Sequence, residues 1–208
     1  MEILNKEEDI QNYINHAISN DNLELEVILG SKESKNPVNK DIFIKLLYKL
    51  KSDFDLISES VNLDIWTNNN GFPSNTRCSI LDLESIKRYC VTNSLEDITN
   101  LSFMNKRKFK NDKISNSKIV NEDYNFKINL KLEDDLDYNE IQISKYNKSL
   151  TNKEKYYKYK KRYSFITPDK LFRIDLSVVK STEWLFKQKK FQWAKTFKDA
   201  DILNRPEQ

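Results

Sequence analysis

Two glutamates near the start of the chain have the spacing of a shared cation site. Glu24 and Glu26 lie in the alternating segment Leu23-Glu24-Leu25-Glu26-Val27, a pattern typical of a β-strand. One residue separates them, so both side chains point to the same side, with Cα atoms roughly 6.5 to 7 Å apart. Two carboxylates at that spacing can hold a hard cation. The competing interpretation is a pair of solvent-facing glutamates on an exposed strand.

Three cations in the second half of the chain repeat this spacing with the opposite sign. Lys158, Lys160 and Arg162 occupy alternate positions and share one face of a predicted strand. Like charges repel, so the row requires either good solvation or anionic groups opposite, and both interpretations stay open. Arg162 and Arg173 are stronger evidence for phosphate binding than any single lysine. The chain has 6 Arg against 29 Lys, and the guanidinium fork suits phosphate oxygens.

The elements that must position these residues are short helices and alternating strands. Apolar spacing of helical type predicts three helices, and Asn5 followed by Glu8 resembles a capping box in front of the first. Their ranges are about 10–18, 39–50 and from 82 onward. Alternation of apolar and charged residues predicts strands over 23–27, 61–65, 126–133 and 172–178. Asn68 to Pro73 is the clearest turn.

These elements predict an α+β fold. With 208 residues, 38% of them hydrophobic, the chain can bury a sizeable core. We expect an antiparallel sheet with the helices packed on its apolar face. If the sheet closes into a β-barrel, its charged faces are interior and would hold a polyanion and its metal. Mg²⁺ or Mn²⁺ on carboxylates, with Lys and Arg neutralising phosphate oxygens, is suited to hydrolysing a phosphoanhydride.

Several other classes are excluded by residues that the chain lacks. Only Gly30 and Gly71 are glycines, so phosphate-binding loops of the Walker or Rossmann type are out. Cys78 and Cys90 fit neither a zinc knuckle nor a disulfide framework, and neither begins a Cys-x5-Arg phosphatase loop. No apolar run approaches the roughly 20 residues that span a bilayer. We therefore expect a soluble intracellular protein without a membrane partner.

Five segments, taken in order, resemble a known family. They are Leu23–Gly30, Asn75–Ile80, Met104–Lys108, Tyr159–Phe165 and Phe172–Lys180. Their order and spacing resemble the triphosphate tunnel metalloenzymes, in particular the RNA 5′-triphosphatase domains of large viral mRNA capping enzymes. The resemblance implies an antiparallel β-barrel tunnel, with a few short helices outside, in which triphosphate-ended RNA loses its γ-phosphate as the first step of capping.

The resemblance also implies a role for individual residues. Glu24 and Glu26 would bind Mg²⁺ or Mn²⁺, while Glu133 and Asp175 would hold metal-bound water or orient the cationic side chains; these four are the expected catalytic residues. Arg173 would pair with Asp175. A further set would contact phosphate oxygens: Arg77, Lys106, Lys158, Lys160 and Arg162.

The chain departs from the family pattern at its end. The family places a second Glu-x-Glu strand there, whereas this sequence ends at Asn204-Arg205-Pro206-Glu207-Gln208. Lys-x-Asp-Gly, the guanylyltransferase nucleophile motif, is absent, so only the triphosphatase step is assigned. We expect one tunnel domain over 1–208, either alone or as the N-terminal part of a longer capping enzyme with guanylyltransferase and methyltransferase domains. A virion or a cytoplasmic viral factory would be its location.

Two alternatives remain open. The same constellation could hydrolyse inorganic tripolyphosphate, nucleoside triphosphates or thiamine triphosphate. The second alternative is a non-catalytic RNA-binding module, because aromatic and basic residues interleave over 156–163 and 184–193. Packing roles are nevertheless the favoured interpretation for four of these rings: Trp184, Phe186, Phe191 and Trp193.

Overall fold

The structure is a computed structural model that describes residues 2–20, 22–29, 39–109, 118–121, 126–136, 140–182, 184–185 and 190–205. It divides into two compact units. The first combines Met1–Asn36 with Met104–Leu136, and the second combines Pro37–Phe103 with Asp137–Gln208. Each unit is therefore built from two stretches that are far apart in sequence.

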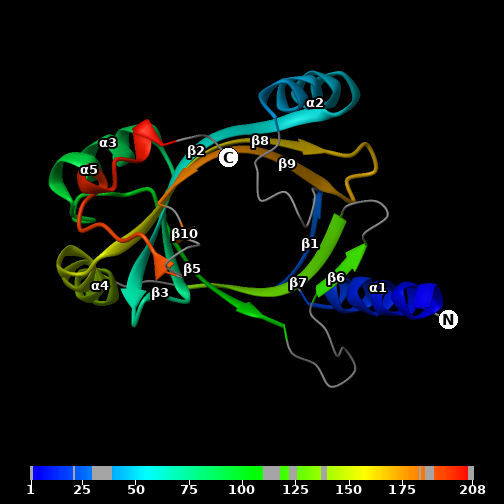
Figure 1. Cartoon of the computed structure of the whole chain (residues 1–208), viewed down its shortest axis with the longest axis horizontal. Helices are drawn as coiled ribbons and strands as arrows, with labels where there is room; N and C mark the ends of the chain where they lie inside the picture. Colours follow the sequence, from blue (N-terminus) through cyan, green and yellow to red (C-terminus); the bar gives the residue numbers. More distant parts are fainter. Residues whose placement is uncertain are drawn as a thin grey trace. The chain divides into compact units, whose positions relative to one another are not determined.

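The first unit packs one helix against a small antiparallel sheet (Figure 1). Its elements are α1 (Glu2–Ile18), β1 (Leu23–Leu29), the second part of β5 (Leu101–Lys108), β6 (Lys118–Asn121) and β7 (Phe126–Asp135). β1, β5 and β6 all pair with β7. Tyr13 of α1 is buried against Ile128 and Leu130 of β7, with Leu23 and Leu25 of β1 packed around them. The apolar face of the alternating strands thus forms this core.

The capping box expected in this unit is wrong. α1 begins at Glu2, so Asn5 and Glu8 lie inside the helix rather than at its start. The apolar spacing that continues from Ile10 to Ile18 fixed the body of the helix but not its first residue, because helix ends depend on weak local signals.

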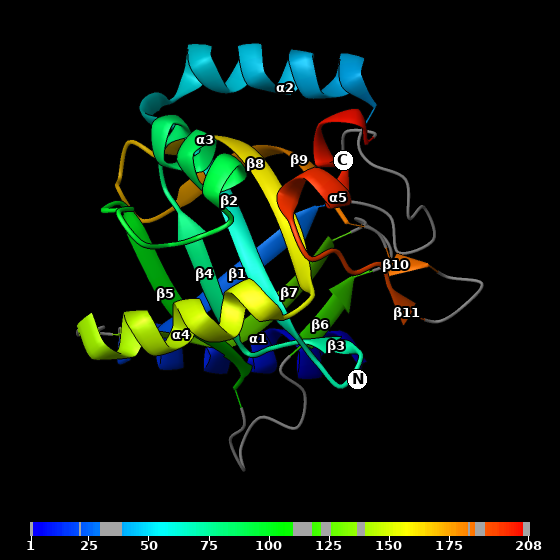
Figure 2. The same cartoon turned by 90° about the vertical axis from the view of Figure 1, so that its left-hand side faces the viewer.

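The second unit contains the long strands (Figure 2). Its elements in chain order are α2 (Lys40–Asp53), β2 (Asp55–Asn69), β3 (Phe72–Pro73), β4 (Thr76–Ile80), α3 (Leu83–Thr92), the first part of β5, α4 (Glu140–Asn152), β8 (Lys155–Ile166), β9 (Arg173–Ser181), β10 (Trp184–Leu185), β11 (Lys190–Phe191), α5 (Phe197–Ala200) and the 3-10 helix η2 (Ile202–Asn204). β2 pairs with β4 on one side and β8 on the other, and β9 pairs with β8. These pairs are antiparallel, as the sequence predicts.

The main sheet has the strand order β1-β7-β5-β4-β2-β8-β9. β5 belongs to both units, since Leu101–Phe103 falls in the second and Met104–Lys108 in the first. The strands predicted over 23–27, 61–65 and 126–133 lie within β1, β2 and β7, and the one predicted over 172–178 corresponds to β9, which begins one residue later. Antiparallel register places directly opposed residues on the same face, so the pairing of strands decides which charged side chains meet.

The turn predicted at Asn68 to Pro73 is a tight hairpin between β2 and β3. Asn68 is opposite Pro73 and Asn69 is opposite Phe72, which leaves a two-residue loop. Asn70 and Gly71 in that loop have φ values of 51° and 86°. Two consecutive positive φ angles are those of a type I′ turn, for which Asn-Gly is the preferred sequence.

One face of the second unit's sheet is apolar and covered by helices. Leu63 and Ile65 of β2 and Tyr157 of β8 are fully buried on it. Tyr89 of α3 lies against Tyr157, with the two hydroxyl oxygens 3.3 Å apart, and the Phe197 ring of α5 contacts Tyr157 edge-on. Burial of this face leaves the opposite face of the same strands to the charged residues.

Candidate functional site

Three glutamates of the first unit share the face of the sheet opposite α1. Glu24 and Glu26 of β1 are opposed by Lys131 and Asn129 of β7, and Glu133 of β7 is opposed by Lys106 of β5. The period-two spacing of the glutamates therefore places them as the sequence predicts, on one face and partly exposed.

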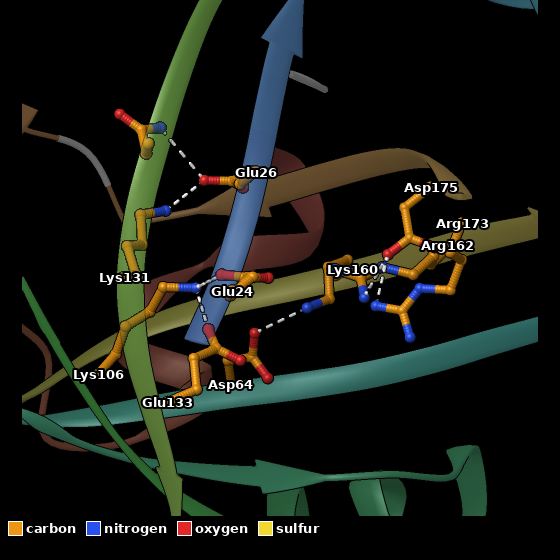
Figure 3. A network of polar contacts seen from close by, with 11 residues as sticks. Glu24, Glu26, Asp64, Lys106, Lys131, Glu133, Lys160, Arg162, Arg173 and Asp175 are labelled. Carbon is orange, nitrogen blue, oxygen red and sulfur yellow. Dashed lines mark hydrogen bonds and ion pairs between the residues drawn. The ribbon is translucent and has the colours of Figure 1, made fainter. Parts of the chain in front are cut away.

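Lys106 joins two of these carboxylates. Its Nζ donates to Oε2 of Glu24 at 2.7 Å and also to Oε1 of Glu133 (Figure 3). Burial lowers the pKa of Lys106, but the hydrogen bonds to Glu133 and Glu24 outweigh it, so the pKa lies above its usual value. The ammonium group is thus held charged between two glutamates from neighbouring strands.

Glu26 has a separate pair of donors on β7. Its Oε2 accepts from Nζ of Lys131 and from Nδ2 of Asn129, the latter at 3.3 Å. Neither donor was among the predicted site residues. Lys131 could have been found, because it alternates with Glu133 in the predicted strand over 126–133 and so shares its face.

The acidic face fits a hard cation in the kind of ligand it offers. Glu24, Glu26 and Glu133 supply carboxylate oxygens from two adjacent strands, and Mg²⁺ and Mn²⁺ prefer such oxygens. Lys106 and Lys131 hold these oxygens in the structure, so a cation would have to take their place. Within the described residues, no three His, Cys, Asp or Glu side chains are already gathered closely enough to hold a metal ion.

The predicted basic row of the second unit lies on the polar face of β8. Lys158, Lys160 and Arg162 are opposed on β2 by Asp64, Asn62 and Ser60. On the far side, Arg162 is opposed by Ser177 of β9. Anionic groups do lie on this face, which decides the question that the sequence left open between solvation and pairing.

Asp64 was not predicted, and it is the buried partner of the row. Its side chain is 4% exposed, and its two oxygens accept from Ser79 Oγ at 2.7 Å and from Lys160 Nζ at 3.0 Å. Burial lowers the pKa of Lys160, the charges of Arg162 and Arg77 lower it further, and Asp64 opposes them. Arg77 therefore lies near enough to Lys160 for its charge to act there. A role of these cations in binding phosphate stays a prediction.

Asp175 of β9 holds the other end of the row. Its Oδ2 lies 2.9 Å from NH1 of Arg162 and 3.2 Å from NH2 of Arg173 (Figure 3). Its Oδ1 accepts from Ser164 Oγ at 2.8 Å. The pairing of Arg173 with Asp175 agrees with the sequence interpretation. Asp175 contacts two cationic side chains, as the expected orienting role requires. That role and a role toward metal-bound water both stay predictions.

Lys158 is placed differently from its neighbours. Its Nζ lies over the ring of Trp66, 5.8 Å from the centroid, and over the ring of Tyr156 at 6.0 Å. Aromatic faces attract such cations. Lys106, the remaining predicted phosphate ligand, belongs to the first unit and contacts the glutamates described above. The predicted cations therefore divide between the two units.

A comparison with solved structures identifies the fold. The chain matches the triphosphatase of the Mimivirus capping enzyme with a TM-score of 0.59, over 91% of this chain and 85% of that one, at 17% sequence identity. The chain has the fold of a viral capping-enzyme triphosphatase. No protein-family model and no curated protein sequence matches it.

This triphosphatase fold confirms the fold class expected from the sequence. It also supports the resemblance drawn from the five segments, since the match extends over most of the chain. At 17% identity the match shows the fold alone, and any function must be argued from the residues of this chain. In the part of the chain that the structure describes, no helix is long and apolar enough to cross a membrane.

Proposed function

We propose that this chain is a metal-dependent polynucleotide 5′-triphosphatase that removes the γ-phosphate from triphosphate-ended RNA, the first step of mRNA capping. The observation that carries this proposal is the pair Lys160 and Arg162 on one strand face, each held by an aspartate of a neighbouring strand. Guanylyltransferase and methyltransferase activities would follow this step, and they remain predicted partners. The fold shared with a capping-enzyme triphosphatase supports the same function.

The basic face is suited to a chain of phosphates. Neighbouring side chains on one face of β8 are roughly 6.5 to 7 Å apart along the strand, so Lys160 and Arg162 can contact successive phosphoryl groups. Arg77 adds a third cation near them. Asp64 and Asp175 orient these cations. Two carboxylates do not neutralise three cations, so this face keeps positive charge that can attract an anion. Arg162 can offer phosphate the N–H groups that Asp175 and Ser177 do not use.

The acidic face is suited to the cation that phosphoryl transfer requires. Bound there, Mg²⁺ or Mn²⁺ would supply Lewis-acid stabilisation of the phosphoryl oxygens and lower the pKa of a bound water. Glu24 and Glu26 would hold it, with Glu133 beside them on β7. Lys106, once released from these carboxylates, could donate to phosphate as the sequence predicts.

Residues of this chain would contribute mainly electrostatic stabilisation. Phosphoryl transfer develops charge on the equatorial oxygens, and cations held in place beforehand stabilise it without reorganising. Lys160 is held by Asp64, and Arg162 is held by Asp175 and Ser177. Such fixed donors orient the substrate at little cost in entropy.

The test is phosphate release from γ-labelled triphosphate-ended RNA, with tripolyphosphate and nucleoside triphosphates as comparison substrates. Lys160→Met should lower kcat/KM for RNA by about a hundredfold, because a charge-assisted phosphate contact is lost. Lys161→Met is the matched control, since Lys161 is adjacent in β8 but exposed on the opposite face. Equal activity in the two variants would remove the phosphate-site assignment. RNA binding without phosphate release would favour the RNA-binding module.

A further inference from the structure

Four aromatic rings gather at one end of the polar face of the second unit. Trp66 of β2 is directly opposed by Tyr156 of β8, and their ring centroids are 5.6 Å apart. Phe191 and Trp193 extend the cluster, with centroids 5.4 and 6.5 Å from that of Tyr156. Three of these rings belong to the two segments, 156–163 and 184–193, in which the sequence interleaves aromatic and basic residues, and Trp66 joins them from β2. The proposed triphosphatase step uses none of the four.

These rings differ from the aromatic residues of the core. On the apolar face of the same sheet, Tyr157 and Phe165 are fully buried. Trp66, Tyr156, Phe191 and Trp193 contact one another, yet each keeps part of its surface open to solvent. The packing role favoured from the sequence for Phe191 and Trp193 therefore describes only part of their surroundings. Partly open rings beside a basic row can stack a base.

The order of side chains along β8 matches the order of groups in a nucleotide triphosphate. Tyr156, Lys158, Lys160 and Arg162 follow one another on one face, roughly 6.5 to 7 Å apart. A nucleoside 5′-triphosphate likewise has an aromatic base at one end and three phosphates at the other. The opposite end of the row carries the polar side chains of Asp175 and Arg173.

Lys158 shows that the Trp66 ring faces this row. Its Nζ lies over the ring, 5.8 Å from the centroid, and the ammonium group belongs to the same strand face as Lys160. A base stacked on Trp66 would occupy the place that Lys158 holds over the ring, and Lys158 would turn to the α-phosphate. The ring and the lysine can thus serve adjoining parts of one ligand.

We propose that Trp66 and Tyr156, supported by Phe191 and Trp193, form a stacking subsite for the first nucleobase of a 5′-triphosphate-ended nucleotide. This subsite rests on the proposed triphosphatase function and gives it a substrate class. It distinguishes nucleotides from inorganic tripolyphosphate, which has no base. It does not distinguish one base from another, because every base has a π-face.

The experiment compares kcat/KM for triphosphate-ended RNA, ATP and tripolyphosphate in wild type, Trp66→Ala and Trp66→Phe. In Trp66→Ala, kcat/KM for RNA and for ATP should fall roughly tenfold, while kcat/KM for tripolyphosphate should stay unchanged. Trp66→Phe should recover most of the lost kcat/KM, because it retains an aromatic ring. Tyr48→Ala is the control, because Tyr48 is an exposed ring on α2. Equal losses for all three substrates, or no loss, would overturn the subsite.

A binding measurement separates this inference from the proposed function. Titration calorimetry with ATP and with tripolyphosphate, both without divalent cations, should show weaker ATP binding in Trp66→Ala and equal tripolyphosphate binding. If wild type released no phosphate from any substrate, the triphosphatase proposal would fail while Trp66-dependent ATP binding would still support the subsite. ATP binding that is the same in wild type and Trp66→Ala would overturn the subsite whatever the activity.

Discussion

Asp64 and Lys160 form an ion pair that is nearly closed to water. The side chains are 4% and 12% exposed, and Lys160 Nζ donates to Asp64 Oδ2 at 3.0 Å. Ser79 Oγ holds the other carboxylate oxygen at 2.7 Å, so the acidic side chain is fixed from both sides. The pair places Lys160 at a defined point of the polar face, and the Asp64 carboxylate opposes the lowering of the lysine pKa by burial.

The first prediction concerns the pH dependence of activity in Asp64→Asn. Burial and the charges of Arg162 and Arg77 lower the pKa of Lys160, and the Asp64 carboxylate opposes this shift. Its removal should lower the pKa further, so Lys160 loses its proton at a lower pH. The alkaline limb of kcat/KM for phosphate release should therefore move toward neutral pH.

Ser79→Ala is the control for that profile, because it removes one hydrogen bond and leaves the carboxylate charge. Its alkaline limb should stay close to that of wild type. Because breaking a buried pair can cost about 3 kcal/mol, the profile is measured below the unfolding temperature of Asp64→Asn. An alkaline limb that is the same in Asp64→Asn and wild type would show that Asp64 does not set the charge of Lys160.

The second prediction is that Asp175 acts by positioning Arg162. Asp175→Ala removes the acceptor 2.9 Å from Arg162 NH1, so KM for triphosphate-ended RNA should rise about tenfold with a smaller change in kcat. Asp175→Asn retains an acceptor oxygen and should restore part of the loss. Arg173→Ala should change KM less than twofold, because Arg173 shares the carboxylate but is more exposed. A larger effect of Arg173→Ala would assign the role to Arg173 instead.

The strand faces could be predicted from the sequence, but their partners could not. Alternation alone placed Glu24 with Glu26 and Lys160 with Arg162, because it requires no knowledge of neighbouring strands. Asp64 was missed because it is the single carboxylate of its alternating segment and its partner Lys160 is 96 residues away. Such a contact follows from register, which is set by packing over the whole sheet.

The helices likewise divide into those predicted from their own sequence pattern and those that were not. The helix expected over 39–50 corresponds to α2, which begins after the N-cap Asn39. α4 was not predicted at all. Its residues Ile143, Tyr146 and Leu150 have the i, i+3, i+7 spacing of a helix, but few apolar residues carry that pattern among many polar ones. Such a segment takes its structure from its neighbours more than from its own pattern.

The third prediction concerns stability and Lys155, which is fully buried at the start of β8. Its Nζ donates to the carbonyl oxygens of Leu150 at 2.7 Å and Lys153 at 3.1 Å. Burial lowers the pKa of Lys155 to about 8, against the opposing charge of Asp199. Between that value and the ordinary 10.5, the unfolded chain binds more protons, so the free energy of unfolding should rise with pH.

Urea unfolding of wild type and Lys155→Met at pH 7.5, 9 and 10 measures this contribution. The stability of wild type relative to the variant should increase across the series, by roughly 1.4 kcal/mol for each unit of pKa difference that is crossed. Lys153→Met is the control, since the Lys153 side chain is exposed. A difference between wild type and Lys155→Met that stays constant with pH would contradict the assignment of this pKa.

The central claim is tested most directly by divalent-dependent phosphate release from γ-labelled triphosphate-ended RNA. Wild type is compared with the double variant Glu24→Gln, Glu26→Gln and with Glu59→Gln, an exposed glutamate of β2. We expect release by wild type and Glu59→Gln only with Mg²⁺ or Mn²⁺, and at least a hundredfold less by the folded double variant. Equal release by the double variant and wild type, or release that needs no divalent cation, would contradict the metal-dependent triphosphatase proposed for this chain.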